Sequence, residues 1–216
     1  MILSFHSPAD VEAAIPVVRT HLAGGGLLAY PTETVYGLGS APDAASLAAL
    51  AALKGRPARK PFLLLVSGRL MAEEYGLQFG AAARALSDAF WPGPLTLVLA
   101  GGEGRLPDGL RGPEGGIAVR HTSHRGIAAL VAQLGFALTS TSANRPGEAT
   151  AAGADGIVEL FGDAIAAGRL LLLDGGVLGN VPPSTIVDCT GPVAVLIREG
   201  ALPRGELRRA VGRLAP

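Results

Sequence analysis

The chain has 216 residues, 49% of them hydrophobic, and its 18 basic side chains balance its 18 acidic ones. This length can bury a large core, while the formal net charge of zero gives no field that attracts nucleic acid, so any RNA contact would have to be local. No apolar stretch approaches the roughly 20 residues that a membrane helix needs, and the N-terminus lacks the features of a signal peptide. The single cysteine, Cys189, excludes an internal disulfide and, lying in an apolar run, is expected to be an inert core thiol. These features favour a cytoplasmic protein without membrane contact.

Strands and helices alternate along the chain. Val11, Ala14, Val18 and Leu22 recur at the spacing of one helical face and predict a helix over residues 8–23. The predicted strands are residues 2–5, 27–30, 62–66, 95–99, 117–120, 136–141, 170–173, 185–189 and 193–198. The other predicted helices are residues 43–53, 71–90 with a break near Gly80, 123–134, 154–161 and 205–214, and residues 101–116 are predicted to be loop. This alternation predicts an α/β sheet, and because no linker or repeat interrupts it, residues 1–216 are expected to form a single domain.

Both lysines of the chain fall within residues 54–60, which read Lys-Gly-Arg-Pro-Ala-Arg-Lys. Every other basic residue is an arginine, so lysine stands where a compact ammonium is needed rather than a planar fork. Two nearby prolines restrict the backbone, and a stiff cationic loop suits phosphates or carboxylates. A simpler interpretation is a helix end, with Gly55 as the cap and Lys54 interacting with the helix dipole. The two interpretations are compatible.

Polar residues gather just beyond the ends of several predicted strands. They are Thr32, Glu33, Thr34, Arg120, the run from Ser140 to Asn144, and Arg198. If these strands are parallel, the groups converge at one edge of the sheet, where ligands of open α/β sheets bind. Ser184 instead precedes its strand, so its membership of the same site would require an antiparallel strand and a mixed sheet.

Each of these groups has an alternative interpretation that needs no ligand. Thr32 or Thr34 could satisfy backbone groups in a turn, and Ser142 and Asn144 could belong to an ordinary loop. The charged or titratable residues that could be solvated surface groups are Glu33, Arg120, Arg198, His121 and His124. No third ligand has metal-site spacing beside the two histidines, so no protein-bound metal is predicted.

Common nucleotide-binding and hydrolase motifs are missing from the sequence. It has no Gly-x-x-x-x-Gly-Lys-Ser/Thr loop, no complete dinucleotide fingerprint and no Gly-x-Ser-x-Gly elbow. A bound nucleotide would therefore depend on side chains and scattered backbone amides. The cationic loop meets that requirement.

Six motifs in this order resemble the YrdC family, the threonylcarbamoyl-AMP synthases. They are residues 30–39 (Tyr-Pro-Thr-Glu-Thr-Val-Tyr-Gly-Leu-Gly), 54–56 with 60–61, 91–96 (Trp-Pro-Gly-Pro-Leu-Thr), 118–120, 140–144 (Ser-Thr-Ser-Ala-Asn) and 183–188. The resemblance runs from about Leu27 to Arg198. It implies a twisted, mixed parallel and antiparallel open sheet with flanking helices around a deep cationic cavity. The chain ends soon after Arg198, as the short form of the family does.

The family resemblance also implies a reaction. L-Threonine, bicarbonate and ATP would give L-threonylcarbamoyl-AMP and pyrophosphate, and separate transferase proteins would then modify the tRNA adenosine beside the anticodon. Mg²⁺ would be carried by the nucleotide. Two alternatives stay open: a non-catalytic YrdC-like RNA-binding protein, and a carbamoyl-adenylate module that uses carbamoyl phosphate.

Residue roles follow from the resemblance by motif match. Catalysis falls to Lys54, Arg56, Ser142 and Asn144, and ATP binding to Arg56, Lys60, Ser142, Asn144, Thr150 and Arg198. Threonine would meet Thr32, Ser140, Ser184 and Arg120, whose guanidinium could grip the carboxylate bidentately. Three positions depart from the family pattern: Leu65 stands where many long-form members have histidine, Pro183 where glutamate is frequent, and Arg145-Pro-Gly where Leu-Ser-Gly is commoner.

Overall fold

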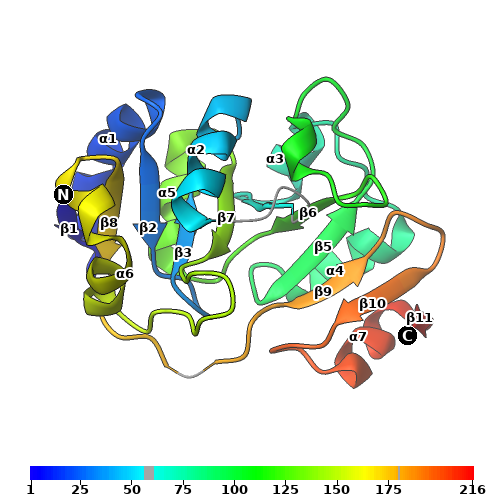
Figure 1. Cartoon of the computed structure of the whole chain (residues 1–216). Helices are drawn as coiled ribbons and strands as arrows, with labels where there is room; N and C mark the ends of the chain where they lie inside the picture. The colour runs from blue at the N-terminus through cyan, green and yellow to red at the C-terminus, as the bar shows by residue number, and fades with distance from the viewer. Residues whose placement is uncertain (56–60, 180) are drawn as a thin grey trace.

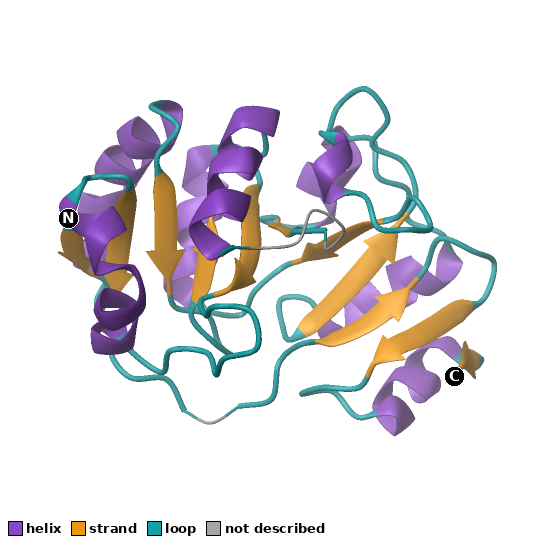
Figure 2. Cartoon of the chain, viewed as in Figure 1, coloured by secondary structure: helices purple, strands orange, loops and turns teal. Residues whose placement is uncertain are grey.

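The computed structural model describes residues 1–55, 61–179 and 181–216. Its centre is a long sheet with helices packed against it (Figures 1 and 2). In spatial order the strands are β1 (Ile2–Ser4), β8 (Leu170–Asp174), β2 (Leu27–Tyr30), β3 (Gly37–Gly39), β7 (Leu138–Ser142), β4 (Leu63–Leu65), β6 (Ile117–Arg120), β5 (Leu95–Leu99), β9 (Thr185–Asp188), β10 (Ala194–Arg198) and β11 (Leu214–Ala215).

The sheet mixes parallel and antiparallel neighbours. β2 is parallel to β8 and antiparallel to β3, while β7 is antiparallel to both β3 and β4. β9 is parallel to β5 and antiparallel to β10. The predicted mixed α/β sheet is therefore confirmed. The strand that follows Ser184, β9, is antiparallel to β10, which Arg198 ends, and parallel to β5.

The helices lie close to the predicted ranges. They are α1 (Pro8–Ala23), α2 (Ala44–Lys54), α3 (Arg69–Glu74), α4 (Ala81–Phe90), α5 (Arg125–Leu134), α6 (Ala154–Ala166) and α7 (Arg204–Val211). α1 packs against α5, α6 against β8, and α4 against α7. No helix in the described ranges is long and apolar enough to cross a membrane.

The largest differences from prediction concern short or terminal elements. α6 continues past residue 161 to Ala166, although Phe161 has non-helical angles (φ −133°, ψ 18°). β3 was not predicted, because Gly-Leu-Gly has low intrinsic strand preference and pairs only through its neighbours β2 and β7. The closing helix ends at Val211, and β11 follows it.

Helix α2 places Lys54 at the site described below. Asp43 caps its start, accepting a 2.9 Å hydrogen bond from the Ser46 amide, and Gly55 ends it in the left-handed conformation (φ 63°). The helix-end interpretation of this segment is thus confirmed. Lys54 is nevertheless only 5% exposed, so its side chain enters the interior rather than solvent.

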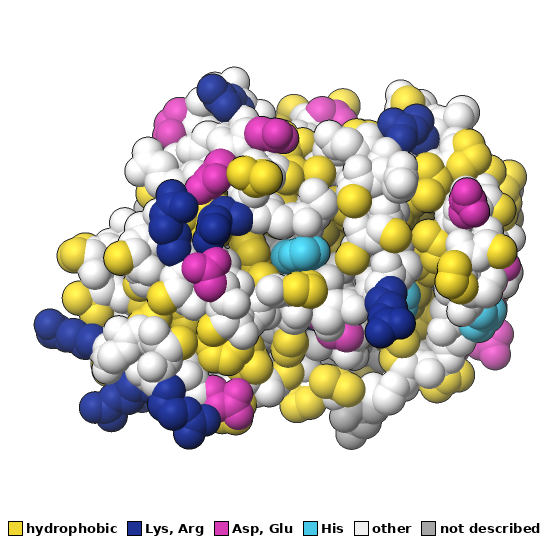
Figure 3. Space-filling view, turned by 180° about the vertical axis from the view of Figure 1, so that it is seen from behind, with side chains coloured by type: hydrophobic (Ala, Val, Ile, Leu, Met, Phe, Trp, Pro, Cys, Tyr) yellow, Lys and Arg dark blue, Asp and Glu magenta, His cyan; other side chains and the backbone are white. Residues whose placement is uncertain are grey.

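Charged side chains of both signs share the face seen from behind, with basic side chains gathered near α7 (Figure 3). This agrees with the balanced formal charge.

Candidate active site

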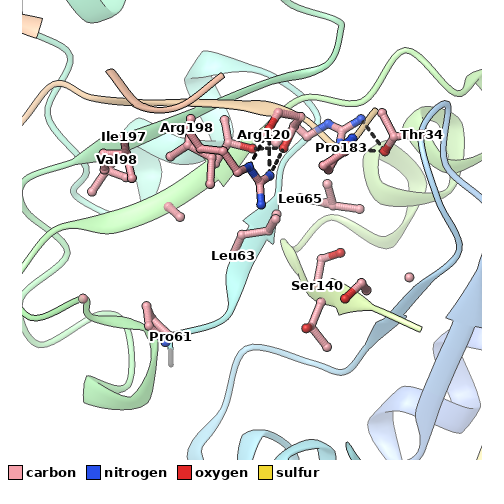
Figure 4. A pocket seen from close by; sticks show the side chains of 18 of the residues that line it. Thr34, Pro61, Leu63, Leu65, Val98, Arg120, Ser140, Pro183, Ile197 and Arg198 are labelled. Carbon is pink, nitrogen blue, oxygen red and sulfur yellow. Dashed lines mark hydrogen bonds between the residues drawn. The ribbon is translucent and has the colours of Figure 1, made fainter. Parts of the chain in front are cut away.

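A cavity of about 580 Å³ lies over one face of the sheet. Its lining includes alternate residues of successive strands: Leu63 and Leu65 of β4, Thr96 and Val98 of β5, Ala118 and Arg120 of β6, and Ser140 and Ser142 of β7 (Figure 4). Side chains two apart share a face of a strand, so these strands present one common wall. Gly37, Thr150, Ser184, Ile186 and Arg198 also line the cavity.

The expectation that parallel strands bring the polar groups to one sheet edge is wrong. β7 is antiparallel to β4, and β4 is parallel to β6, so β6 and β7 run in opposite directions. The groups meet because they project from one face of the sheet and from its connecting loops. Thr32, Arg120, Ser140, Ser142, Ser184 and Arg198 all line this cavity.

Lys54 joins the end of α2 to the end of β7. Its Nζ donates to Asn144 Oδ1 at 2.8 Å, to Asn144 O at 3.1 Å and to the carbonyl of Ser142, and lies 3.4 Å from Ser142 Oγ. Ser142 Oγ also donates to Asn144 Oδ1 at 2.7 Å. Three of the four predicted catalytic residues are thereby brought together. The fourth, Arg56, and the predicted ATP contact Lys60 lie outside the described residues.

Asn144 also organises the loop that follows it. Its Nδ2 donates to the carbonyl of Glu148 at 2.6 Å, and the carbonyl of Ala143 accepts from the Ala151 amide at 3.1 Å. Thr150, within this loop, lines the cavity. Arg145 points elsewhere: it donates to the carbonyl of Leu160 at 3.2 Å and lies over the ring of Phe161.

Arg120 is a buried cation at the other end of the cavity. Its NH2 lies 2.7 Å from Glu33 Oε1, both terminal nitrogens lie 3.3 Å from Thr34 Oγ1, and Nε donates to the carbonyl of Gly93 at 3.3 Å. The residue is 5% exposed, so the surface-charge interpretation is wrong for it. These contacts use four of the five guanidinium N–H groups. In this arrangement one N–H of NH1 is left for a ligand, rather than the pair that a bidentate grip needs.

Glu33 is the partner that compensates this buried charge. Its side chain is 18% exposed, and it accepts from the Thr122 hydroxyl and, at 3.0 Å, from the Ser123 amide. Burial by itself would raise its pKa, but the Arg120 charge and these hydrogen bonds outweigh burial and lower the pKa to about 2. Glu33 is thus an ionised, fixed carboxylate, and its interpretation as a solvated surface group is wrong.

The two threonines beside Glu33 form a hydroxyl relay with a fixed direction. Thr32 Oγ1 donates to the carbonyl of Val35 at 2.7 Å and accepts from the amides of Thr34 and Val35. Because its only proton is used, the 3.0 Å contact between the two hydroxyls must have Thr34 as donor. The turn interpretation of Thr32 is confirmed, and its hydroxyl is already saturated in this structure.

Arg198 is the second guanidinium of the cavity. Its Nε and NH2 donate to the carbonyl of Ser184 at 3.2 and 2.7 Å, while Ser184 Oγ lies 2.9 Å from Thr96 Oγ1 (Figure 4). A register shift between Leu196 and Arg198 marks a bulge in β10, and the consecutive residues Ile197 and Arg198 both line the cavity. Burial, followed by the charge of Arg120, lowers the pKa of Arg198.

The departures from the family pattern at Leu65 and Pro183 fall on the cavity wall. Leu65 is 1% exposed and presents an apolar surface where histidine would be polar. Ser140, which pairs with Leu63 of β4, is 7% exposed and interacts with the buried Tyr30, whose pKa is raised mainly by burial.

The two histidines have structural contacts. His124 Nδ1 caps α5, accepting from the Ile127 amide at 3.3 Å, and His121 packs edge-on against Trp91. Burial lowers the pKa of both imidazoles against the opposing charge of Glu33. Both are partly buried, so the surface interpretation is wrong. In the described part of the chain no three His, Cys, Asp or Glu residues are grouped as metal ligands.

Sequence reasoning missed the supporting groups Thr96 and Thr122. Thr34 was named within the Thr-Glu-Thr motif, but it was given no role toward Arg120. Thr96 and Thr122 are joined to their partners by contacts 88 and 89 residues apart in sequence, for which no local pattern exists.

Comparisons with known proteins place the chain in a family. A family model described as Telomere recombination, Sua5_yciO_yrdC, matches residues 20–200. A threonylcarbamoyl-AMP synthase of Thiobacillus denitrificans is 39% identical over 184 residues, covering 84% of this chain and 95% of the relative.

Solved structures of similar proteins superpose on most of the chain. Pyrococcus abyssi Sua5 complexed with L-threonine superposes with a TM-score of 0.86 at 29% identity, over 100% of this chain and 63% of that one. This chain thus spans less than two thirds of that protein. E. coli YciO gives a TM-score of 0.77 at 25% identity, over 94% and 96% of the two chains. The chain belongs to the Sua5/YciO/YrdC family.

Proposed function

We propose that this protein is an L-threonylcarbamoyladenylate synthase, which forms threonylcarbamoyl-AMP and pyrophosphate from L-threonine, bicarbonate and ATP. The observation that carries the proposal is the clustering of Lys54, Ser142 and Asn144 at one side of a cavity whose other side holds Arg120 and Ser184. The names of the relatives support it: threonylcarbamoyl-AMP synthase, and a Sua5 complexed with L-threonine.

The proposed chemistry is a nucleotidyl transfer. The threonine amine combines with bicarbonate, with loss of water, to give a carbamate. A carbamate oxygen then attacks the α-phosphorus of ATP, and the bond to the bridging oxygen breaks as pyrophosphate leaves. Negative charge builds on the phosphoryl oxygens, so cations placed there stabilise the transition state more than the ground state. Lys54 and Arg56 are the proposed cations, and Ser142 and Asn144 fix the position of Lys54.

Substrate positions follow from the two ends of the cavity. We assign the ATP phosphates to the side of Lys54 and Thr150, and the threonine to the side of Arg120 and Ser140. Lys60 is proposed as a further ATP contact from the family resemblance. Arg198, which donates to the carbonyl of Ser184, is also proposed to contact the nucleotide.

Threonine recognition needs one anion contact and one hydroxyl contact. Arg120 keeps one N–H for the carboxylate. Ser140 or Ser184 can form a hydrogen bond with the substrate hydroxyl, and valine, which lacks this hydroxyl, would bind less tightly. Because the Thr32 hydroxyl is saturated by its own turn, the proposed contact from Thr32 falls to its backbone.

Mg²⁺ is proposed to arrive on the triphosphate rather than in a protein site. Glu114 and Asp188 are carboxylates among the described lining residues, and oxygen ligands of this kind suit Mg²⁺ alongside phosphates. When bound, the ion would neutralise phosphate charge. The described lining residues include two arginines and two carboxylates, whose charges balance. The strongly cationic cavity implied by the family resemblance therefore stays a prediction.

The product is proposed to serve tRNA modification by separate transferase proteins, with any contact of this chain to tRNA being local. The test of the function is pyrophosphate release measured with and without threonine and bicarbonate, followed by mass spectrometry of the product. We expect release only with both, and threonylcarbamoyl-AMP as the product. Carbamoyl-AMP, or no nucleotide product with tight RNA binding, would overturn the proposal in favour of the carbamoyl-adenylate or RNA-binding alternative.

A further inference from the structure

We propose that Glu33 is a positioning residue for the threonine substrate, acting only through Arg120. The inference rests on the proposed function and deepens it, because it assigns a role to a residue that does not line the cavity. Glu33 is absent from the cavity wall, whereas Arg120 and Thr34 are part of it.

The guanidinium of Arg120 is held in a fixed position by its neighbours. An arginine side chain has many rotamers, and a substrate carboxylate gains most from a guanidinium that is already held in place. Arg120 is held on three sides, by Glu33 at 2.7 Å, Thr34 at 3.3 Å and the carbonyl of Gly93 at 3.3 Å. Of these partners only Glu33 is charged, so it provides the strongest contact.

The carboxylate of Glu33 is itself held in place by hydrogen bonds. Thr122 donates to Oε2 and the Ser123 amide to Oε1, and the Thr122 hydroxyl accepts in turn from the His124 amide at 3.2 Å. All three of these residues lie just beyond β6, the strand that Arg120 ends. The segment that carries the guanidinium therefore also fixes its counterion.

Two guanidinium groups, those of Arg120 and Arg198, line the same cavity. Burial first, and the charge of Arg120 second, lower the pKa of Arg198. Glu33 offsets the Arg120 charge inside a low-exposure site, where an unpaired guanidinium would be costly. Within the described part of the chain, the charge of Glu33 also acts on the flanking imidazoles of His121 and His124.

The hydrogen bonds that lead from Arg120 through the two threonine hydroxyls all run in one direction. Arg120 donates to Thr34 Oγ1, Thr34 donates to Thr32, and Thr32 donates to the carbonyl of Val35. Every proton of this relay points away from Arg120, so the relay begins at the guanidinium that Glu33 fixes. A displaced Arg120 would therefore disturb the hydroxyls of the threonine side as well.

The experiment measures KM for threonine, KM for ATP and kcat in three single variants. Glu33→Gln keeps the shape of the side chain and removes its charge, and Thr122→Val removes one donor to Glu33. Glu73→Gln is the control. It removes the charge of the ion pair between Glu73 and Arg84 (3.2 Å), which lies outside the cavity lining. We expect Glu33→Gln to raise KM for threonine about 10- to 100-fold with KM for ATP unchanged. Thr122→Val should shift the same constant less, and Glu73→Gln should leave it unchanged.

A double variant tests whether Glu33 acts through Arg120. Glu33→Gln combined with Arg120→Lys should be no worse in kcat/KM for threonine than Arg120→Lys alone, because the carboxylate then has no guanidinium to hold. Additive losses, or equal rises in both KM values, would overturn the inference. A protein that binds threonine normally in both Glu33→Gln and Thr122→Val would also overturn it while leaving the function standing. Wild-type protein whose pyrophosphate release ignores threonine would overturn both.

Discussion

Lys54 Nζ and Asn144 Oδ1 lie 2.8 Å apart although 90 residues separate them in sequence. The contact ties the end of α2 to the loop after β7 and leaves the ammonium surrounded by oxygens of Ser142 and Asn144. A compact ammonium with three donors fits between these oxygens, whereas the planar guanidinium of arginine does not. The structure thus gives a physical reason for the lysine at position 54 in a chain whose basic residues are mostly arginine.

Replacing Lys54 should remove activity while the fold persists. We expect Lys54→Met to lower the rate of pyrophosphate release by about 10²- to 10³-fold or more, because a cation near the reacting phosphate is lost. The oxygens left without their donor should lower the free energy of unfolding by about 1–3 kcal/mol. Enzyme assays combined with urea unfolding followed by circular dichroism would measure both.

Lys54→Arg is the matched comparison, since it keeps the charge. A planar guanidinium cannot occupy the same oxygen cage, so this variant should stay close to Lys54→Met in rate. Full activity in Lys54→Arg would show that charge alone suffices, and full activity in Lys54→Met would remove Lys54 from the mechanism.

Adding a methyl group at Gly200 should damage the threonine side of the cavity. A Cβ there would lie 2.1 Å from the carbonyl oxygen of Pro183 and 2.8 Å from that of Ser184. Because Arg198 is bound to the same Ser184 carbonyl, Gly200→Ala should displace both and raise KM for threonine about 10-fold or more. Gly205→Ala is the control: a Cβ there meets nothing within 4 Å, and its KM should match wild type.

Glu33 should make the stability of the protein sensitive to acid. Its folded-state pKa of about 2 lies below its ordinary value of 4.5, so ionised Glu33 stabilises the fold above about pH 4.5 and this contribution is lost as the pH falls toward 2. The shift corresponds to about 3 kcal/mol of unfolding free energy. Urea unfolding at pH 7 and pH 3 should therefore show Glu33→Gln less stable than wild type at pH 7 and nearer to it at pH 3. An equal gap at the two pH values would contradict the ion pair.

Cys189 should be unreactive in the folded protein. The residue is 8% exposed, and burial, followed by the charge of Asp188, raises the pKa of its thiol to about 12. We expect no alkylation by iodoacetamide at pH 8 in buffer and complete alkylation in urea, measured by mass spectrometry, because only the thiolate reacts. Cys189→Ala should keep full activity, and rapid labelling of the native protein would refute this assignment.

Most of the secondary structure was predictable from the sequence. Apolar residues at helical spacing mark α1, and a continuous apolar run marks β8. It could not reveal β3, where two of three residues are glycine, nor β11, which is two residues long. For such segments strand identity comes from the neighbouring strands rather than from local preference.

The candidate site was predictable where a motif marked it and hidden where tertiary contacts made it. Ser142 and Asn144 were identified from the Ser-Thr-Ser-Ala-Asn run, and the structure brings both to Lys54. The role of Glu33 depends on a partner 87 positions along the chain, which no spacing rule connects. Likewise the polar groups converge through the face of a mixed sheet, and strand directions are fixed only by pairing.

The bulge in β10 makes that strand sensitive to length more than to composition. Deleting Ile197, the one residue between Leu196 and Arg198, would restore a regular ladder in which Arg198 still pairs with Ile186 on the cavity side. It would remove one of the two consecutive side chains that the bulge turns toward the cavity. Loop grafting or gene shuffling that crosses this strand should therefore preserve its residue count, while exposed Val195 offers a tolerant position for labels.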